Sequence, residues 1–502
     1  MTRLVQRRLD TPLDPLAFYE VVSDGGARPD TGLFEANDGR TLVMAAAAVR
    51  ASARAGRVTL EALTANGAAL LADVARRAGM AVSHTLVLDY IPSESADAEE
   101  RLVAPAPLHA LRNLLAAAGA QADPFGALLL GVSSFDQAGF SEDLPPPHSD
   151  PLDFPDYLFW VPESLAVVEP SGGARLLCPA FGHDERQLND AARRLEQLLG
   201  AAAALDRQPS ADGRAGSSSA PTADLDDQAF AAVVRRAKEA IAAGQVYQIV
   251  PSRTFSAPCP SPLRAYRSLR TIEPSSYRFY LAGVGFTLLG ASPETSVRLF
   301  RGPEGGLTVE VKPIAGTRPR GATPDEDDRL EAEMRLDGKE LAEHMMLVDL
   351  ARNDVARVSL PGTRRVAKLL TVERFSRVMH LVSSVTGKLR IGLDAFDALA
   401  ACLNVGTLTG APKIRAMQLL RELEGTRRGP YGGAVGWVNG AGLMDTAVVI
   451  RSALVIDGTA FVRAGAGVVH DSDPLAEAAE TRAKASALLG VLAAPADTRV
   501  AA

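Results

Sequence analysis

The stretch AGAGVVHDSDPLAEAAETRAK, from Ala464 to Lys484, decides how the rest of the chain is interpreted. Gly465 and Gly467 lack a Cβ, so their backbone amides can approach an anion closely. From Pro474 onward the pattern predicts a helix, and three of its charged residues share one face. These are Glu477, Glu480 and Lys484. Carboxylates and an ammonium beside an anion cradle suit a negatively charged substrate held through Mg²⁺. A solvated helix face is the alternative.

The composition excludes several classes of protein. Of 502 residues, 47% are hydrophobic and 23% are charged, which is enough to build a large core. A net charge of −7 without a basic stripe argues against nucleic acid as the main partner. We expect a cytoplasmic chain with no membrane span, because uncharged apolar runs are short. Cys178, Cys259 and Cys402 lie far apart, so neither a disulfide frame nor a thiolate zinc site is expected.

Short apolar runs between polar turns predict an α+β protein. Residues 1–205 should form strands with helices at 61–79 and 186–204, and the polar segment 206–227 predicts a flexible linker. Residues 228–490 then form the catalytic region. Its expected elements are a helix ending at Gly244, a long helix at 326–357, and strands at 278–290, 307–314, 432–439, 445–455 and 459–464. Without a regular βαβ repeat, this order favours a mixed α+β sandwich.

A second charged helix lies in the sequence LDGKELAEHMMLVDLARND. It carries Glu340, Glu343 and His344 within one and a half turns. Two helices that each present carboxylates three residues apart can meet across a cleft and offer oxygen ligands to Mg²⁺. Surface ion pairing is the alternative, and His344 alone is more often packed than a ligand. The apolar residues of this helix are expected to face inward: Met345, Leu347, Val348 and Leu350.

Arg451 interrupts an apolar strand with a charge that needs a partner. Its planar guanidinium suits bidentate capture of a carboxylate, and a structural ion pair is the alternative. Tyr431 lies between glycines that let a ligand approach.

Eight blocks, in this order and spacing, resemble the chorismate-binding enzymes, and most closely the large subunit of anthranilate synthase. They are YQIVPSR, LLGASPET, KPIAGTRPRG, KELAEHMMLVDLARND, VMHLVSSVTGKLR, GTLTGAPKIRAM, GPYGGAVGW and AGAGVV…AEAAETRAK. The match is dense from about residue 228 to 490 and thinner from 10 to 200. The resemblance implies a sandwich of antiparallel sheets surrounded by helices.

The resemblance also implies roles for individual residues. Glutamates matching Glu343 and Glu480, with those matching Glu340 and Glu477 nearby, bind the Mg²⁺ that holds the ring carboxylate of chorismate. The enolpyruvyl carboxylate is held by the counterparts of Arg451, Tyr431, Lys484 and the backbone amides of Gly465, Ala466 and Gly467. Glu294 matches the general acid that protonates the departing C4 hydroxyl. Thr407 and His380 match residues near the ring, and His380 is linked to removal of the C2 proton when pyruvate leaves.

Two positions separate the branches of this family. Isochorismate and salicylate synthases carry a lysine base where this chain has Gln248, and aminodeoxychorismate synthases carry a nucleophilic lysine at Ala315. Both absences point to ammonia as the nucleophile at C2. We therefore predict Mg²⁺-dependent amination of chorismate to 2-amino-2-deoxyisochorismate. The alternative is a full anthranilate synthase that goes on to eliminate pyruvate, and retention of His380 favours it. A noncatalytic scaffold is less expected, because every position that should touch metal or substrate holds a competent residue.

The tryptophan feedback site of the family is altered in this chain. Glu35 and Tyr277 remain, whereas the family's serine, proline and methionine are replaced by Ala36, Ser276 and Arg278. A lost hydroxyl and an inserted cation should weaken tryptophan binding by roughly a few kcal/mol, as suits a secondary-metabolite pathway. No cysteine lies in the glycine-flanked turn of a glutaminase, so we predict a separate glutamine amidotransferase subunit. Whether the chain also pairs with a second copy of itself as a homodimer is left open by the sequence.

Overall fold

The computed structural model describes residues 3–81, 83–119, 122–182, 184–205, 220–303, 305–374 and 378–493. Two long strands, β3 (Thr41–Arg54) and β7 (Tyr157–Val168), organise it. Their pairing shifts register between Met44 and Val49, and such bulges bend strands. On one side of the bulges, β3 pairs with β2 (Thr31–Glu35) and β7 pairs with β8 (Ala174–Ala180). On the other side, β3 pairs with β4 (Arg57–Ala62) and β7 pairs with β6 (Leu128–Ser133). The same pair of strands therefore belongs to two sheets.

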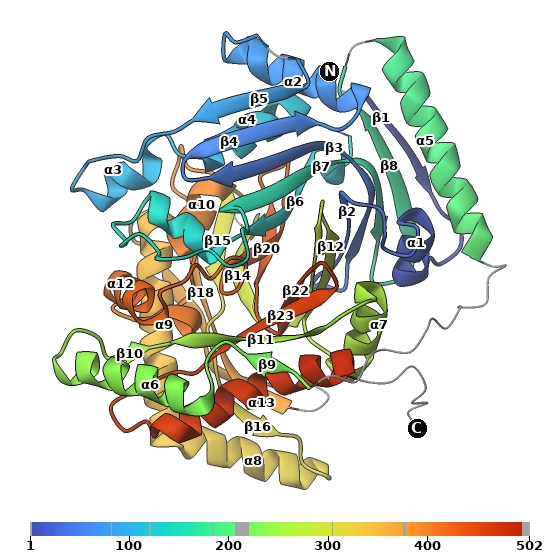
Figure 1. The fold of residues 1–502 in the computed structure, drawn as a ribbon. Coiled ribbons are helices and arrows are strands. Elements are labelled where there is room, and N and C mark those ends of the chain that lie inside the picture. Colours follow the sequence, from blue (N-terminus) through green and yellow to red (C-terminus); the bar gives the residue numbers. More distant parts are fainter. Residues whose placement is uncertain are drawn as a thin grey trace.

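The two sheets are halves of one continuous hydrogen-bonded sheet, which has 21 strands within the described residues, and both halves are antiparallel (Figure 1). The first continues from β2 through β12 (Tyr277–Ala282), β13 (Phe286–Ser292), β22 (Ser452–Ile456), β23 (Thr459–Gly465) and β11 (Ser252–Pro258), with β9 (Thr222–Ala223) and β1 (Arg3–Arg8) at its edges. The second continues from β6 through β20 (Ala434–Asn439), β21 (Met444–Val448), β14 (Thr295–Arg301), β15 (Leu307–Val311) and β18 (Val378–Lys388), which also pairs with β16 (Ile314–Pro319) and β17 (Arg365–Arg374). β5 (Thr85–Asp89) extends β4, and β10 (Gln248–Ile249) pairs with β19 (Gly410–Ala411).

An apolar core fills the space between the sheets. Phe34, Trp160 and Phe279 are fully buried in it, together with Val435 of the second sheet and Leu454 of the first. Aromatic and branched side chains of this size supply most of the burial energy of a sandwich. The α+β class and the antiparallel sandwich predicted from the sequence are confirmed.

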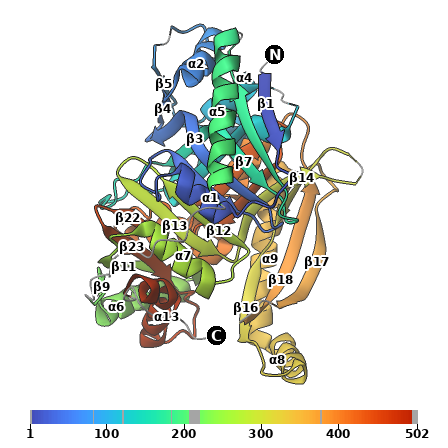
Figure 2. The ribbon, with the colours of Figure 1, turned by 90° about the vertical axis from the view of Figure 1, so that its right-hand side faces the viewer.

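Helices cover the outer faces of both sheets (Figures 1 and 2). Over the first lie α1 (Pro15–Val22), α5 (Glu185–Ala204), α7 (Pro262–Ile272) and α13 (Pro474–Ala493), and α6 (Asp227–Ala242) packs on α13. Over the second lie α2 (Ala65–Arg77), α4 (Leu108–Ala118), α9 (Gly338–Val358) and α10 (Ala395–Cys402). The remaining helices are α3 (Ala98–Val103), α8 (Pro324–Leu336), α11 (Gly406–Thr409) and α12 (Lys413–Glu424). Figure 2 shows α8 at the lower end of β16, β17 and β18. Within the part of the chain described above, no helix is both long and apolar enough to cross a bilayer.

Several expected elements are divided in the structure. The helix expected at 326–357 is two, because the Asp337 side chain accepts the Glu340 amide at 3.2 Å and begins α9 after α8 has ended. The strand expected at 278–290 is the hairpin β12–β13, and that at 445–455 is split by Arg451, whose φ is +49°. Met345, expected to face inward, is 41% exposed.

The N-terminal and C-terminal segments share both sheets, since β2 pairs with β12 and β6 pairs with β20. Of the expected linker at 206–227, residues 206–219 lie outside the described residues. Its end is ordered, because Thr222–Ala223 form β9 and α6 begins at Asp227. The division of the chain into an N-terminal region and a catalytic region therefore rests on the sequence alone.

Candidate active site

Seven of the fourteen residues predicted to act in catalysis, substrate binding or metal binding meet in one pocket with a volume of about 200 Å³. It lies where β16, β18 and β23 approach α11 and α13. The predicted residues that line it are Glu294, His380, Thr407, Tyr431, Arg451, Gly465 and Lys484. They come from separate elements of both sheets, so only the tertiary fold brings them together.

Glu294 has the environment of a general acid. It lies in the turn between β13 and β14, is 6% exposed, and accepts a hydrogen bond of 2.9 Å from the Thr407 hydroxyl on Oε1. Burial raises the pKa of Glu294 to about 8, although Thr407 and Lys484 act in the opposite direction. The carboxyl is therefore protonated at neutral pH and can donate that proton into the pocket.

His380 is held on β18 by its Nδ1 atom. This atom lies 2.9 Å from the Thr317 hydroxyl and 3.3 Å from the Gly316 carbonyl. Gly316, with a φ of +77°, forms the irregularity in the β16–β18 pairing that aims this carbonyl at the ring. Burial lowers the pKa of His380, the Gly316 hydrogen bond opposes this, and Arg451 lowers it further. A neutral ring with its proton on Nδ1 presents Nε2 as the basic nitrogen.

Arg451 and Tyr431 supply the polar side of the pocket. The Arg451 guanidinium lines it and also lies 3.6 Å from Glu273, the residue that ends α7. The Tyr431 side chain is buried, and a Cβ on Gly465 would lie 3.0 Å from its hydroxyl. Only glycine permits this close approach of the β23 backbone.

A buried ion network that the sequence did not reveal supports this wall. The Glu424 side chain is 3% exposed and accepts hydrogen bonds of 2.7 to 2.9 Å from Arg428, Arg463 and Ser252. Arg428 also donates to the carbonyls of Leu408 and Val250. The network ties β11, β23 and the end of α11 together, and Arg463 itself lines the pocket. Glu424 and Arg428 are an i,i+4 pair that the sequence displays, but Ser252 and Arg463 are distant from them, so no local pattern indicated the whole network.

The glycine turn after β23 differs from expectation at one position. The Lys484 ammonium donates to the Gly465 carbonyl at 3.1 Å and pairs with Glu480 at 2.7 Å. The Ala466 amide, however, donates to the Pro251 carbonyl at 3.1 Å. Strand pairing already uses this amide, so it does not serve as the anion donor that was expected.

Gln248 connects the glycine turn to α9. Its side chain is 2% exposed, and Nε2 lies 3.5 Å from a carboxylate oxygen of Glu343. A Cβ on Gly467 would lie 2.9 Å from the same nitrogen. Among the described residues, the Gln248 Oε1 atom has no hydrogen-bond partner.

The four predicted metal-binding glutamates border the pocket region without forming a ready cluster. Glu340 pairs with Arg318 at 3.1 Å, and Glu480 pairs with Lys484. Within the described ranges, no three His, Cys, Asp or Glu side chains form a group that could hold a metal ion. Neighbouring cations therefore neutralise two of the four carboxylates in this structure. His344 is fully buried with Nε2 2.7 Å from the Ser383 hydroxyl, which confirms the packed interpretation.

The altered effector site is closed by an internal ion pair. Arg278 lies opposite Glu35 in the β12–β2 register, and its guanidinium lies 2.7 Å from the Glu35 carboxylate. Arg270 and the Tyr266 hydroxyl bind the same carboxylate at 2.9 and 2.8 Å. The cation at Arg278 is thus compensated within the chain, since a buried carboxylate needs a cation.

The other members of the effector set are also engaged or buried. The Tyr277 hydroxyl hydrogen-bonds Thr295 and Asp445, Ala36 is buried, and Ser276 is half-buried.

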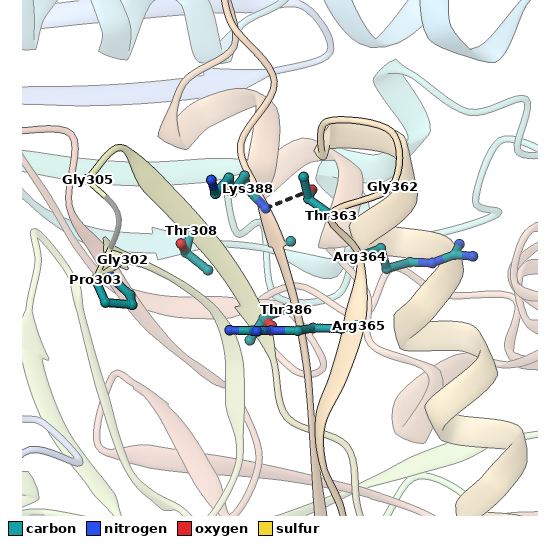
Figure 3. Close-up of a pocket in the computed structure, with 11 residues that line it drawn as sticks. Gly302, Pro303, Gly305, Thr308, Gly362, Thr363, Arg364, Arg365, Thr386 and Lys388 are labelled. Atoms are coloured by element: carbon teal, nitrogen blue, oxygen red, sulfur yellow. Dashed lines mark hydrogen bonds between the residues drawn. The ribbon is translucent and has the colours of Figure 1, made fainter.

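A larger cavity of about 290 Å³ lies elsewhere, between the β14–β15 turn and the start of β17. Figure 3 shows Arg365 reaching over Thr386, while Arg364 points away. Its described lining holds threonines, glycines, Pro303 and three cations, and none of the predicted site residues. We do not assign the chemistry to it.

Comparison with known proteins identifies the family of the chain. A family model described as chorismate binding enzyme matches residues 76–490. Anthranilate synthase component 1, pyocyanine specific, of Pseudomonas aeruginosa is 49% identical over 453 residues, covering 87% of this chain and 84% of that protein. Anthranilate synthase component 1 of Salmonella typhimurium is 43% identical over 504 residues, covering 96% and 95%.

Solved structures give the same result. Anthranilate synthase component I from Streptococcus pneumoniae superposes with a TM-score of 0.71 at 30% identity, covering 90% of this chain and 92% of that one. The Escherichia coli isochorismate synthase MenF, at 18% identity, shares the fold with a TM-score of 0.67 and covers 98% and 95%.

Proposed function

Since the chain belongs to the chorismate-binding enzymes, of the anthranilate synthase component I type, we propose that it aminates chorismate at C2 with ammonia. One observation carries this proposal. A fully buried carboxyl, Glu294, with a pKa of about 8 shares a pocket with a neutral histidine and with Arg451 and Tyr431. Such a set can hold a carboxylate and protonate a leaving hydroxyl at neutral pH.

The pocket suggests how the residues divide the work. Arg451 and the Tyr431 hydroxyl bind the enolpyruvyl carboxylate, which places the C4 hydroxyl at Glu294. Glu294 donates its proton as the C4–O bond breaks, the ring double bond shifts, and ammonia forms the new bond at C2. The Gln248 amide oxygen, which has no hydrogen-bond partner in the described structure, can accept an N–H of ammonia and orient it.

The residues also fit Mg²⁺. Glu343 lies beside Gln248, and Gly467 leaves open the space beside Gln248 that a Cβ would fill. Mg²⁺ in enzymes usually takes one or two carboxylates with waters and substrate oxygens, so a ready cluster of four is not required. We assign Glu343 and Glu480 as ligands, with Glu340 and Glu477 near them. When bound, the ion would neutralise the ring carboxylate and fix its position.

For the released product we favour anthranilate over 2-amino-2-deoxyisochorismate. His380 is held by Nδ1 in the pocket, so its Nε2 can take the C2 proton as pyruvate leaves. The relatives named above also carry the name anthranilate synthase component 1. The pyocyanine-specific relative supports a secondary-metabolite role, as does the closed effector site at Glu35.

We propose that ammonia comes from a separate glutamine amidotransferase subunit. The three thiols of the chain are buried, and burial raises the pKa of Cys178 and Cys259 to about 11 and that of Cys402 to about 12. Thiols of this kind are poor nucleophiles for glutamine.

Product analysis tests the proposal. The purified chain is incubated with chorismate, an ammonium salt and Mg²⁺, and the products are identified by mass spectrometry. Anthranilate with free pyruvate is expected, and chelation of the metal should abolish turnover. An aminated species that keeps the enolpyruvyl group would show that the reaction stops at 2-amino-2-deoxyisochorismate. Isochorismate as the product would refute the proposal that the chain aminates chorismate. Turnover of glutamine by the chain alone would contradict the need for a partner.

A further inference from the structure

Glu294 and Thr407 line a second cavity of about 20 Å³ behind the main pocket. A buried water needs roughly 10–15 Å³ and two or more polar partners, so there is room for about one water. The polar walls are Glu294, Thr407, Lys312 and Asp354, and the remaining walls are largely apolar. The cavity therefore joins the proposed general acid to Asp354 on α9.

Asp354 is part of a buried ion pair. It is 6% exposed, and its carboxylate lies 2.6 Å from the Lys413 ammonium, whose side chain is 10% exposed. Burial raises the pKa of Asp354, while Lys413 lowers it. The other charged and titratable groups that face the pair are Arg357, Glu142, Lys312 and Cys402, and Arg357 is itself paired with Glu142 at 3.0 Å. Asp354 and Lys413 lie in two blocks quoted above, DLARND and GAPKIRAM, to which the proposed amination gives no role.

The proposed reaction creates a need for such a pair. Glu294 loses its proton each time a hydroxyl departs, and the resulting carboxylate lies where burial disfavours charge. The ammonium formed at C2 releases one proton, so one proton must be returned to Glu294 for the cycle to close. The main pocket is filled by substrate at that moment, whereas the small cavity opens on Glu294 from behind.

We propose that the Asp354–Lys413 pair returns this proton through a water molecule in the small cavity. The water gives a proton to Glu294 and takes one from Asp354, which lines the cavity and receives the proton of the Lys413 ammonium across their 2.6 Å contact. Lys413 regains its proton from solvent, which has received the proton released at C2, so protons balance. Asp354 and Lys413 are positioning and relay residues that do not touch substrate. This inference rests on the proposed amination.

Three variants test the relay in the intact chain, with ammonium as nitrogen source. Asp354→Asn breaks the pair, Ala351→Val fills the cavity without altering a charge, and Lys413→Arg keeps a cation. Asp349→Asn, on the exposed face of the same helix, is the matched control.

For Asp354→Asn and Ala351→Val we expect kcat about tenfold lower or more, an unchanged KM for chorismate, and a larger solvent deuterium isotope effect on kcat. A high concentration of imidazole buffer should restore turnover, because this external acid can protonate Glu294 through the main pocket once product has left it. Lys413→Arg should lose kcat in the same way, because a guanidinium does not release its proton at neutral pH, whereas Asp349→Asn should stay within about threefold of the unmodified chain.

A purely structural role would lower kcat without buffer rescue and without a changed isotope effect, and that result overturns the proposal. If Asp354→Asn does not fold, Ala351→Val decides, and an unchanged kcat there overturns it too. Failure of the unmodified chain to aminate chorismate would instead refute the proposed function, so it is measured first.

Discussion

Replacing Glu294 with glutamine should separate activity from stability. The amide keeps an oxygen for the 2.9 Å hydrogen bond from Thr407 and nearly the same volume, but it cannot donate a carboxylic proton. General acids contribute on the order of 10²–10⁴ in rate, so we expect kcat to fall about 100-fold or more with little change in KM. In the unmodified chain, kcat should decline above about pH 8 as Glu294 ionises, and this alkaline limb should be absent in the variant.

The same substitution should stabilise the fold at alkaline pH. The pKa of Glu294 is raised from 4.5 to about 8, so between these values the folded chain binds more protons than the unfolded chain. Stability is therefore lost as pH rises through this window. For a fully buried group, the loss between pH 5 and pH 8 is at most about 3 kcal/mol. Glutamine removes this titration, so Glu294→Gln should lose less stability over the same interval.

Urea unfolding at pH 5 and pH 8, combined with continuous assays of chorismate consumption, measures both effects. Glu310→Gln is the matched control, since Glu310 is a buried carboxylate that accepts from Ser384 at 2.6 Å outside the pocket. The reasoning fails if Glu294→Gln keeps more than a tenth of kcat, if its alkaline limb persists, or if both chains lose equal stability between the two pH values.

Three further variants, two single and one double, probe the pocket and the altered effector site. His380→Asn should leave amination in place but accumulate the species that keeps its enolpyruvyl group, detected by mass spectrometry; anthranilate at the normal rate would contradict the role of Nε2. Arg451→Gln should lower kcat/KM for chorismate about 10- to 100-fold, since charge-assisted hydrogen bonds contribute about 1.5–3 kcal/mol, and an unchanged value would place the carboxylate elsewhere. The unmodified chain should show no tryptophan binding in calorimetry at 100-fold excess, whereas Arg278→Met combined with Ala36→Ser should bind it; micromolar binding by the unmodified chain would defeat the closed-site interpretation.

The sequence by itself determined the α+β class, the order of most strands and helices, and the family. These properties depend on residues that are close together in the sequence. The signals are alternation along strands, helical periodicity, and blocks such as LLGASPET and GTLTGAPKIRAM at fixed spacing. Local breaks were harder to read. The Asp337 side chain caps a new helix within a helical run that looked continuous. Arg451 has a left-handed backbone conformation that ends an apolar strand. In each case one capping side chain or one backbone angle outweighs the periodic pattern.

Only the tertiary structure decided which side chains come into contact and which are buried away from water. Thr407 reaches Glu294 across 113 residues, and Arg278 neutralises Glu35 because two strands that lie far apart in the sequence pair in one register. The Ala466 amide donates its hydrogen bond to the Pro251 carbonyl. Arg318 pairs with Glu340 and Lys484 pairs with Glu480, two of the carboxylates expected to bind metal. Desolvation and long-range ion pairing depend on packing in three dimensions, and they set the protonation of Glu294 and the access of ligands to each charge.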